Sequence, residues 1–110
     1  MISRYAACQS TIPARATPAD RTASTYLRHA LAELARGDTD GAESTLRQAL
    51  QLDPDNAEAL YQLGLLRARR GDRFGARPIL LAALRASERH PPQPALAVSI
   101  AAELARLLQG

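Results

Sequence analysis

Apolar residues recur three and four positions apart along most of this chain, which is the spacing of one face of an α-helix. Leu27, Leu31 and Leu34 form one such stripe, and Leu96, Ile100 and Leu104 form another. Gly, Asp and Pro interrupt the pattern at intervals. The pattern therefore predicts five amphipathic helices, over residues 18–36, 39–51, 56–70, 73–89 and 94–109.

Residues that favour the ends of helices mark where these helices begin and stop. Thr17 can cap the first helix. Gly37 suits the left-handed conformation that ends a helix, and Asp38 can cap the next one. Proline cannot continue a helix, so Asp53-Pro54-Asp55 ends the second helix and Pro91–Pro94 separates the last two.

Three side chains test how these helices pack. We expect Phe74 to pack inward and Pro78 to distort or delay the first turns of its helix. Gly64 lies inside a helix, where it costs about 1 kcal/mol relative to Ala, so it predicts a close approach of a neighbouring helix. The last helix should bury an apolar face that includes Leu108, and present to solvent a polar face of Ser99, Glu103 and Arg106.

A period of 34 residues relates the stretch Ala23–Leu50 to the stretch Ala57–Leu84. Matching small and large apolar positions at a fixed period are the mark of a helical repeat. The aligned pairs are Gly37 with Gly71, Asp38 with Asp72, Ala42 with Ala76, Leu46 with Leu80, Ala49 with Ala83 and Leu50 with Leu84.

This pattern resembles the tetratricopeptide repeat, a 34-residue helix–turn–helix unit with large and small apolar residues at set positions. The second unit carries Leu60, Leu63, Gly64, Ala76 and Leu80 at those positions, but has Arg67 and Glu88 where the family has a large apolar residue and Pro. The first unit carries Tyr26, Ala30, Ala42, Leu46 and Pro54, and departs from the pattern at His29 and Glu33. The last helix is similar to the first half of a third unit through Ala97, Ile100, Ala101 and Leu104.

The resemblance implies an all-α fold, a short superhelix of antiparallel helix pairs with about five helices. We expect residues 1–16 to be a flexible arm and residues 17–110 to form the repeat domain. Within that domain, unit one spans 23–56, unit two spans 57–90, and residues 94–109 are a capping helix or half unit.

Composition agrees with an all-α domain and indicates in which cellular compartment the protein lies. Of the chain, 46% is hydrophobic and 4% aromatic, and its 14 basic residues are all Arg, with a formal net charge of +3. High Arg and Ala content is typical of GC-rich bacterial coding sequence, an interpretation we prefer to an acidic partner. The single Cys8 excludes an internal disulfide. No run approaches the roughly 20 apolar residues of a membrane span, so we expect a cytoplasmic protein without a membrane partner.

No catalytic constellation is visible, so we expect a protein that is not an enzyme. The two histidines, His29 and His90, have neither cysteine nor carboxylate neighbours at the spacing of metal ligands. No phosphate-binding glycine loop is present. We therefore expect no metal site and no bound cofactor.

The resemblance also implies a binding surface, because in this family the first helix of each unit lines a concave groove. Matched by position, that groove is apolar, which suits a helix or an extended peptide of a protein partner. Adaptors and bacterial secretion chaperones with similar repeats use such a groove. The expected groove residues are Leu27, Arg28, Leu31, Leu34, Glu58, Tyr61, Gln62, Leu65 and Arg69, with Arg28, Glu58 and Arg69 orienting the partner at the rim.

Two other functions remain open from the sequence. The chain could cover its own groove, with residues 1–16 or with a second copy as a homo-oligomeric scaffold subunit. The arginine cluster from Arg67 to Arg77 could contact nucleic acid. We rank that third, because few aromatic residues are present to stack on bases.

Overall fold

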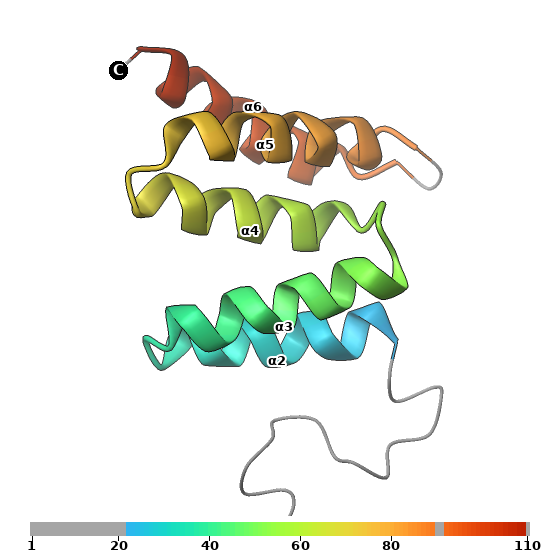
Figure 1. The fold of residues 1–110 in the computed structure, drawn as a ribbon. Coiled ribbons are helices and arrows are strands. Elements are labelled where there is room, and N and C mark those ends of the chain that lie inside the picture. Colours follow the sequence, from blue (N-terminus) through green and yellow to red (C-terminus); the bar gives the residue numbers. More distant parts are fainter. Residues whose placement is uncertain (1–21, 90–91, 110) are drawn as a thin grey trace, which may run out of the picture. The chain divides into compact units, whose positions relative to one another are not determined.

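The computed structural model describes residues 22–89 and 92–109, which form five α-helices and no strand. These are α2 (Ala23–Ala35), α3 (Thr39–Leu52), α4 (Ala57–Arg69), α5 (Arg73–Ser87) and α6 (Pro94–Gln109), shown in Figure 1. The predicted all-α fold is confirmed. The expected arm at 1–16, the cap at Thr17, and the residues Cys8 and His90 lie outside the described residues.

The first helix begins later than the sequence suggested. Thr22 has an extended backbone, and its side chain accepts a hydrogen bond from the Thr25 backbone N–H. This is the geometry of an N-cap, so α2 starts at Ala23, and the expectation of one helix running from residue 18 is wrong. The error arose because threonine is a good cap at both positions, 17 and 22.

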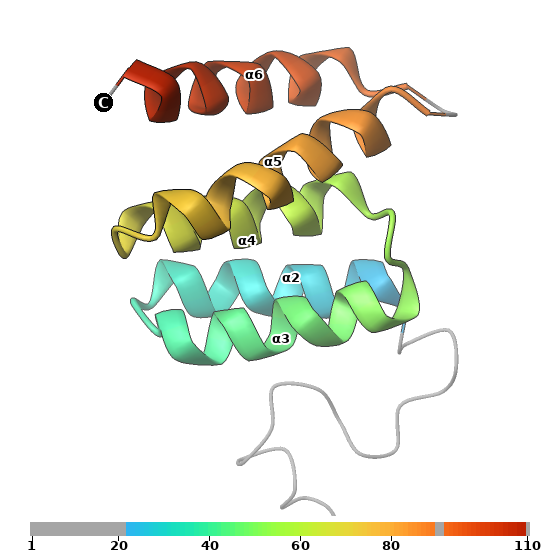
Figure 2. The same ribbon diagram turned by 45° about the horizontal axis from the view of Figure 1, so that its top comes forward.

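The chain divides into two units, one up to Leu52 and one from Asp53 onward. In the first unit, α2 and α3 pack against each other. In the second unit, α4 pairs with α5, and α6 packs against both. Figures 1 and 2 show that α6 runs back along α5, so that α4 and α6 point in similar directions.

Both helix pairs turn through the same structure, 34 residues apart. Gly37 and Gly71 have φ values of +83° and +87°, a conformation that glycine adopts without strain. In the second turn the Asp72 N–H donates to Arg67 O at 2.9 Å and the Gly71 N–H to Ala68 O at 3.0 Å. This pair of bonds is a Schellman motif, and the first turn repeats it.

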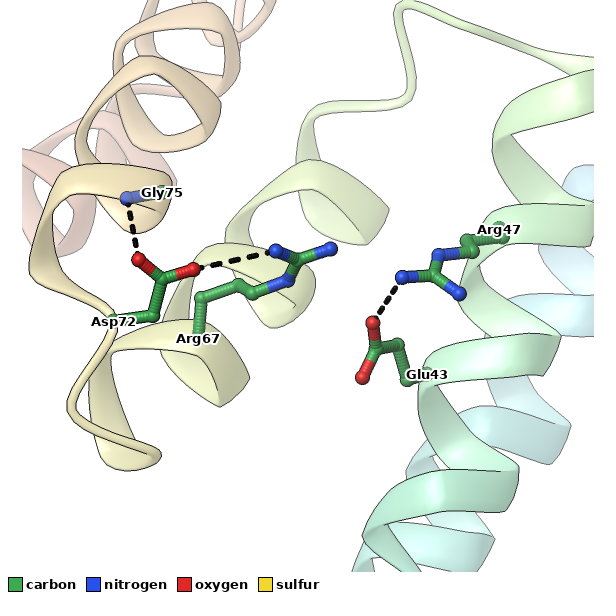
Figure 3. A network of polar contacts seen from close by, with 5 residues as sticks. All are labelled: Glu43, Arg47, Arg67, Asp72 and Gly75. Atoms are coloured by element: carbon green, nitrogen blue, oxygen red, sulfur yellow. Dashed lines mark hydrogen bonds and ion pairs between the residues drawn. The ribbon is translucent and has the colours of Figure 1, made fainter.

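The aspartate after each glycine also starts the following helix. The Asp72 carboxylate accepts the Gly75 N–H at 2.9 Å, and Asp38 accepts the Gly41 N–H at 3.0 Å. Figure 3 shows the Asp72 contact, with Arg67 donating to the second carboxylate oxygen at 3.3 Å. The predicted cap at Asp38 is confirmed. One residue thus ends one helix and begins the next.

The first unit buries small residues and one polar pair. Thr45 Oγ1 donates to Glu33 Oε1 at 2.7 Å, and both residues are buried. This bond satisfies a carboxylate that departs from the apolar residue of the repeat pattern. Glu43 pairs with Arg47 one turn later (Figure 3). The buried apolar residues are Ala23, Ala30, Ala42, Leu46 and Ala49.

The second unit has a core centred on α5 and α6. Ala76, Leu80, Ala83 and Ile100 are fully buried. A Cβ added at Gly64 would lie 2.6 Å from Leu80 Cδ2, so the predicted close approach of α4 and α5 is confirmed. Partly buried hydrophobic residues surround this core: Leu60, Tyr61, Ala68, Leu84, Leu96, Leu104 and Leu107.

One expectation for α5 is wrong, and a second is wrong in part. Phe74 is 84% exposed, because the buried face of the helix passes through Ala76, Leu80 and Ala83 instead. Pro78 lies inside the helix without delaying its start, which Asp72 fixes at Arg73. A proline this close to the N-terminus removes only one interior N–H donor, and the remaining bonds keep the helix continuous.

The last helix has an apolar outer face, contrary to expectation. Leu107 contacts the core, but Leu108 is 67% exposed, since adjacent residues lie about 100° apart around a helix and only one can face inward. Ala101 is also exposed, although the repeat pattern assigns it a packing position. The outer face comprises Val98, Ala101, Ala105 and Leu108.

The repeated turn predicts a specific effect of Gly71→Ala. A Cβ at this position meets no atom within 4 Å, so the cost comes only from the positive φ. We expect the free energy of unfolding to fall by about 1 kcal/mol in urea titrations. Gly71→Asn should lose less, because Asn tolerates this conformation better. Equal stability of the Ala variant and the wild type would contradict the account.

Candidate functional site

The surface between α4 and α6 on the second unit carries two separate pockets. Glu58, Tyr61 and Leu65 follow one face of α4, and Leu96, Ser99 and Glu103 follow the facing side of α6. The two helices are held at this separation because both pack against α5. We call this surface the α4–α6 groove and describe it from its two ends.

The Glu58 end of the groove has a mixed lining with one charged group. Its volume is about 500 Å³, within the range of pockets that accept ligands. Gln62 Nε2 donates to Glu58 Oε2 at 3.4 Å and steadies that carboxylate. The lining residues are Glu58, Tyr61, Gln93, Pro94, Ala95, Leu96 and Ser99.

The arginine end of the groove lies between the end of α4, the start of α5 and the end of α6. Its volume is about 360 Å³. Leu65, Ala68 and Leu107 form its apolar walls. Its charged residues are Arg69, Arg73, Glu103 and Arg106, and Gly71 completes the lining.

The three arginines of that end are held differently. Arg73 Nη2 donates to the Leu107 carbonyl at 2.6 Å, which ties the end of α6 to the start of α5. Arg106 Nη1 lies 2.8 Å from Glu103 Oε2 on the same helix. Arg69 is exposed and makes no ion pair within the described part of the chain. Arg73 therefore belongs to a fixed framework at this end, and Arg69 is the arginine there with no ion pair in the described part of the chain.

The groove residues expected from the sequence fall on two helices. Glu58, Tyr61, Leu65 and Arg69 line the α4–α6 groove, and Gln62 bonds to Glu58 beside it. The other four expected residues, Leu27, Arg28, Leu31 and Leu34, lie on α2 of the first unit. There Leu27 and Leu34 are half-buried, Leu31 is 38% exposed, and Arg28 lines a recess with His29 and Ala32.

Sequence reasoning missed the contribution of α6. Ser99, Glu103 and Arg106 were expected to face solvent as a polar cap. Ser99 and Arg106 are exposed, and all three residues also line the pockets opposite α4. The available signal was the stripe of Leu96, Ile100, Leu104 and Leu107. Once that stripe packs on the core, the polar residues beside it must border the neighbouring helix.

The arginine cluster at 67–77 does not form one open patch. Arg67 donates a hydrogen bond to the Asp72 carboxylate, and Arg73 donates one to the backbone carbonyl of Leu107. Arg69 and Arg77 are exposed. The cluster is therefore partly used in holding the second unit together.

The described residues contain no group of three or more His, Cys, Asp or Glu side chains that could hold a metal ion. None of the helices in this part of the chain is both long and apolar enough to cross a membrane. The groove offers apolar surface, hydroxyl and amide groups, and charges at its ends.

Residues 30–71 match the family model of the TPR repeat. This segment belongs to the TPR repeat family. The match runs from the middle of α2 through α3 and α4, so it contains the first Gly-Asp turn and ends at Gly71 of the second. TPR repeats are protein-interaction modules and generally non-catalytic. No curated protein matches the chain.

Proposed function

We propose that this TPR repeat chain is a non-catalytic adaptor or chaperone-like module that binds an extended peptide in the α4–α6 groove. The observation that carries the proposal is the pair of pockets between α4 and α6, where Tyr61, Leu65 and Leu107 offer apolar contact between charged ends. Peptide grooves gain affinity from apolar anchors and specificity from a few polar groups at fixed positions.

The rigid setting of the groove supports this role. Its floor residues Tyr61, Leu96 and Leu107 pack against the fully buried core of the second unit. A preformed groove orders few of its own side chains on binding and so loses less entropy. The expected α2 residues, Leu27, Arg28, Leu31 and Leu34, remain a second proposed contact surface. We place this activity in the cytoplasm of a bacterial cell, as composition suggested.

Self-association is a second candidate, favoured by the outer face of α6. Val98 and Leu108 are 71% and 67% exposed there, with exposed alanines between them. Apolar residues arranged on one helix face are typical of helix pairing. Contact with nucleic acid ranks third, because Arg67 and Arg73 are engaged within the protein.

Filling the groove tests the first candidate. Ser99→Trp places an indole at the Glu58 end, so we expect affinity for a peptide selected by the wild-type chain to fall by at least about tenfold. The matched control is Ala101→Trp, the same substitution on an exposed position on the opposite side of α6. Fluorescence anisotropy of the labelled peptide measures both. Wild-type affinity in the Ser99→Trp variant, with its helical content intact, would contradict the proposal.

Sedimentation equilibrium over a wide concentration range tests self-association. If α6 pairs with a second copy, Val98→Glu should shift the chain toward monomer, because a buried unpaired carboxylate opposes association. A wild-type chain that stays monomeric throughout would rule out this candidate.

A further inference from the structure

We propose that the arginine end of the α4–α6 groove binds two acidic side chains of the partner segment. This inference rests on the proposed function, because it names the kind of peptide that the same groove takes. The apolar groove alone does not require a charged peptide or fix which way round it binds. This inference adds both: the peptide carries negative charge, and that charge lies at the arginine end.

The charge balance at the arginine end favours a negatively charged ligand. Among the described residues, three guanidinium groups, those of Arg69, Arg73 and Arg106, border the pocket with one carboxylate, that of Glu103. Two positive charges therefore remain unbalanced beside the apolar walls. Charges next to a low-dielectric wall interact more strongly than charges in open water, so an anionic group gains more here than elsewhere on the surface.

The hydrogen-bond donors at this end belong to a group that suits a carboxylate. A guanidinium presents five N–H donors in a planar fork that matches carboxylate oxygens. Arg73 uses one donor on the Leu107 carbonyl, which fixes the position of its head group. Arg69 donates to no carboxylate among the described residues. The side chain of Arg106 is 74% exposed, although it pairs with Glu103. Donors therefore remain for more than one carboxylate.

Two acidic side chains fit this end better than one free chain terminus. A terminal carboxylate supplies a single negative charge, which would leave half of the surplus unbalanced. Two neighbouring Asp or Glu residues supply two charges from one short segment. The partner is therefore a peptide with a pair of acidic residues at one side of an apolar stretch.

The Glu58 end of the groove determines which way round the peptide binds. Of the described residues that line that end, Glu58 is the one with a charge, and its sign is opposite to that of the arginines. Glu58 and Arg69 are eleven residues apart on α4, which corresponds to about 16 Å at 1.5 Å per residue. An extended peptide covers that length with about five residues at 3.3 Å each. The acidic pair thus lies at the arginine end, and apolar residues follow toward Glu58.

Selection from random peptides tests the proposal without a known partner. The probes are two synthetic decapeptide libraries, one with both termini blocked and one with a free C-terminal carboxylate. The full chain selects from each as wild type and as Arg69→Glu. The control is Arg77→Glu, an identical charge change at an exposed arginine that does not line the groove.

We expect the blocked library to yield peptides with two acidic residues beside an apolar run. Replacing both acids by Gln in a selected peptide should weaken binding by about tenfold or more, as should Arg69→Glu, because each removes charge-assisted hydrogen bonds. Arg77→Glu should retain wild-type affinity within about twofold. Binding of the acidic peptide should also weaken at high salt.

Other outcomes separate the two proposals. Peptides that bind the groove equally well after the Gln replacements would overturn the acidic requirement and leave the proposed function standing. Selection from the free-carboxylate library alone, with no acidic side chains enriched, would assign the arginine end to a chain terminus and overturn this inference. If neither library yields a binder that Ser99→Trp excludes, the proposed function fails, and this inference with it.

Discussion

The repeated Gly-Asp turn is the constraint on which the described structure depends. In each copy, one aspartate closes the preceding helix through its N–H and starts the next through its carboxylate. Helix ends otherwise leave backbone donors and acceptors without partners, so two residues here supply partners for groups at both ends. It also sets the point of reversal, which brings Gly64 of α4 against Leu80 of α5.

The groove follows from that pairing. Because α4 and α5 approach closely, they present a surface on which α6 buries Ile100 and the leucines beside it. The bond from Arg73 to the Leu107 carbonyl then holds the far end of α6. What remains between α4 and α6 is a surface with a carboxylate at one end and arginines at the other. The electrostatic difference between these ends thus arises from the same contacts that fix the fold.

Most of the fold could be predicted from the sequence, because its signals are local. The turns at Gly37 and Gly71 and the 34-residue spacing of buried alanines and leucines depend on residues close together in the chain. The candidate site was harder to predict. Leu107 and Leu108 look alike in sequence, and only packing shows which one faces inward. The groove side of α6 likewise depends on the position of α4, a contact between segments about 40 residues apart.

The central claim is that partners bind between α4 and α6. Photo-crosslinking tests it most directly, with a photoreactive side chain in place of Ala95 in the groove or of Ala105 on the outer face of α6. Both positions are exposed on the same helix, so reactivity and folding are matched. The account predicts that a selected peptide crosslinks at position 95 and not at 105. Crosslinking at 105 alone, or equally at both positions, would contradict it.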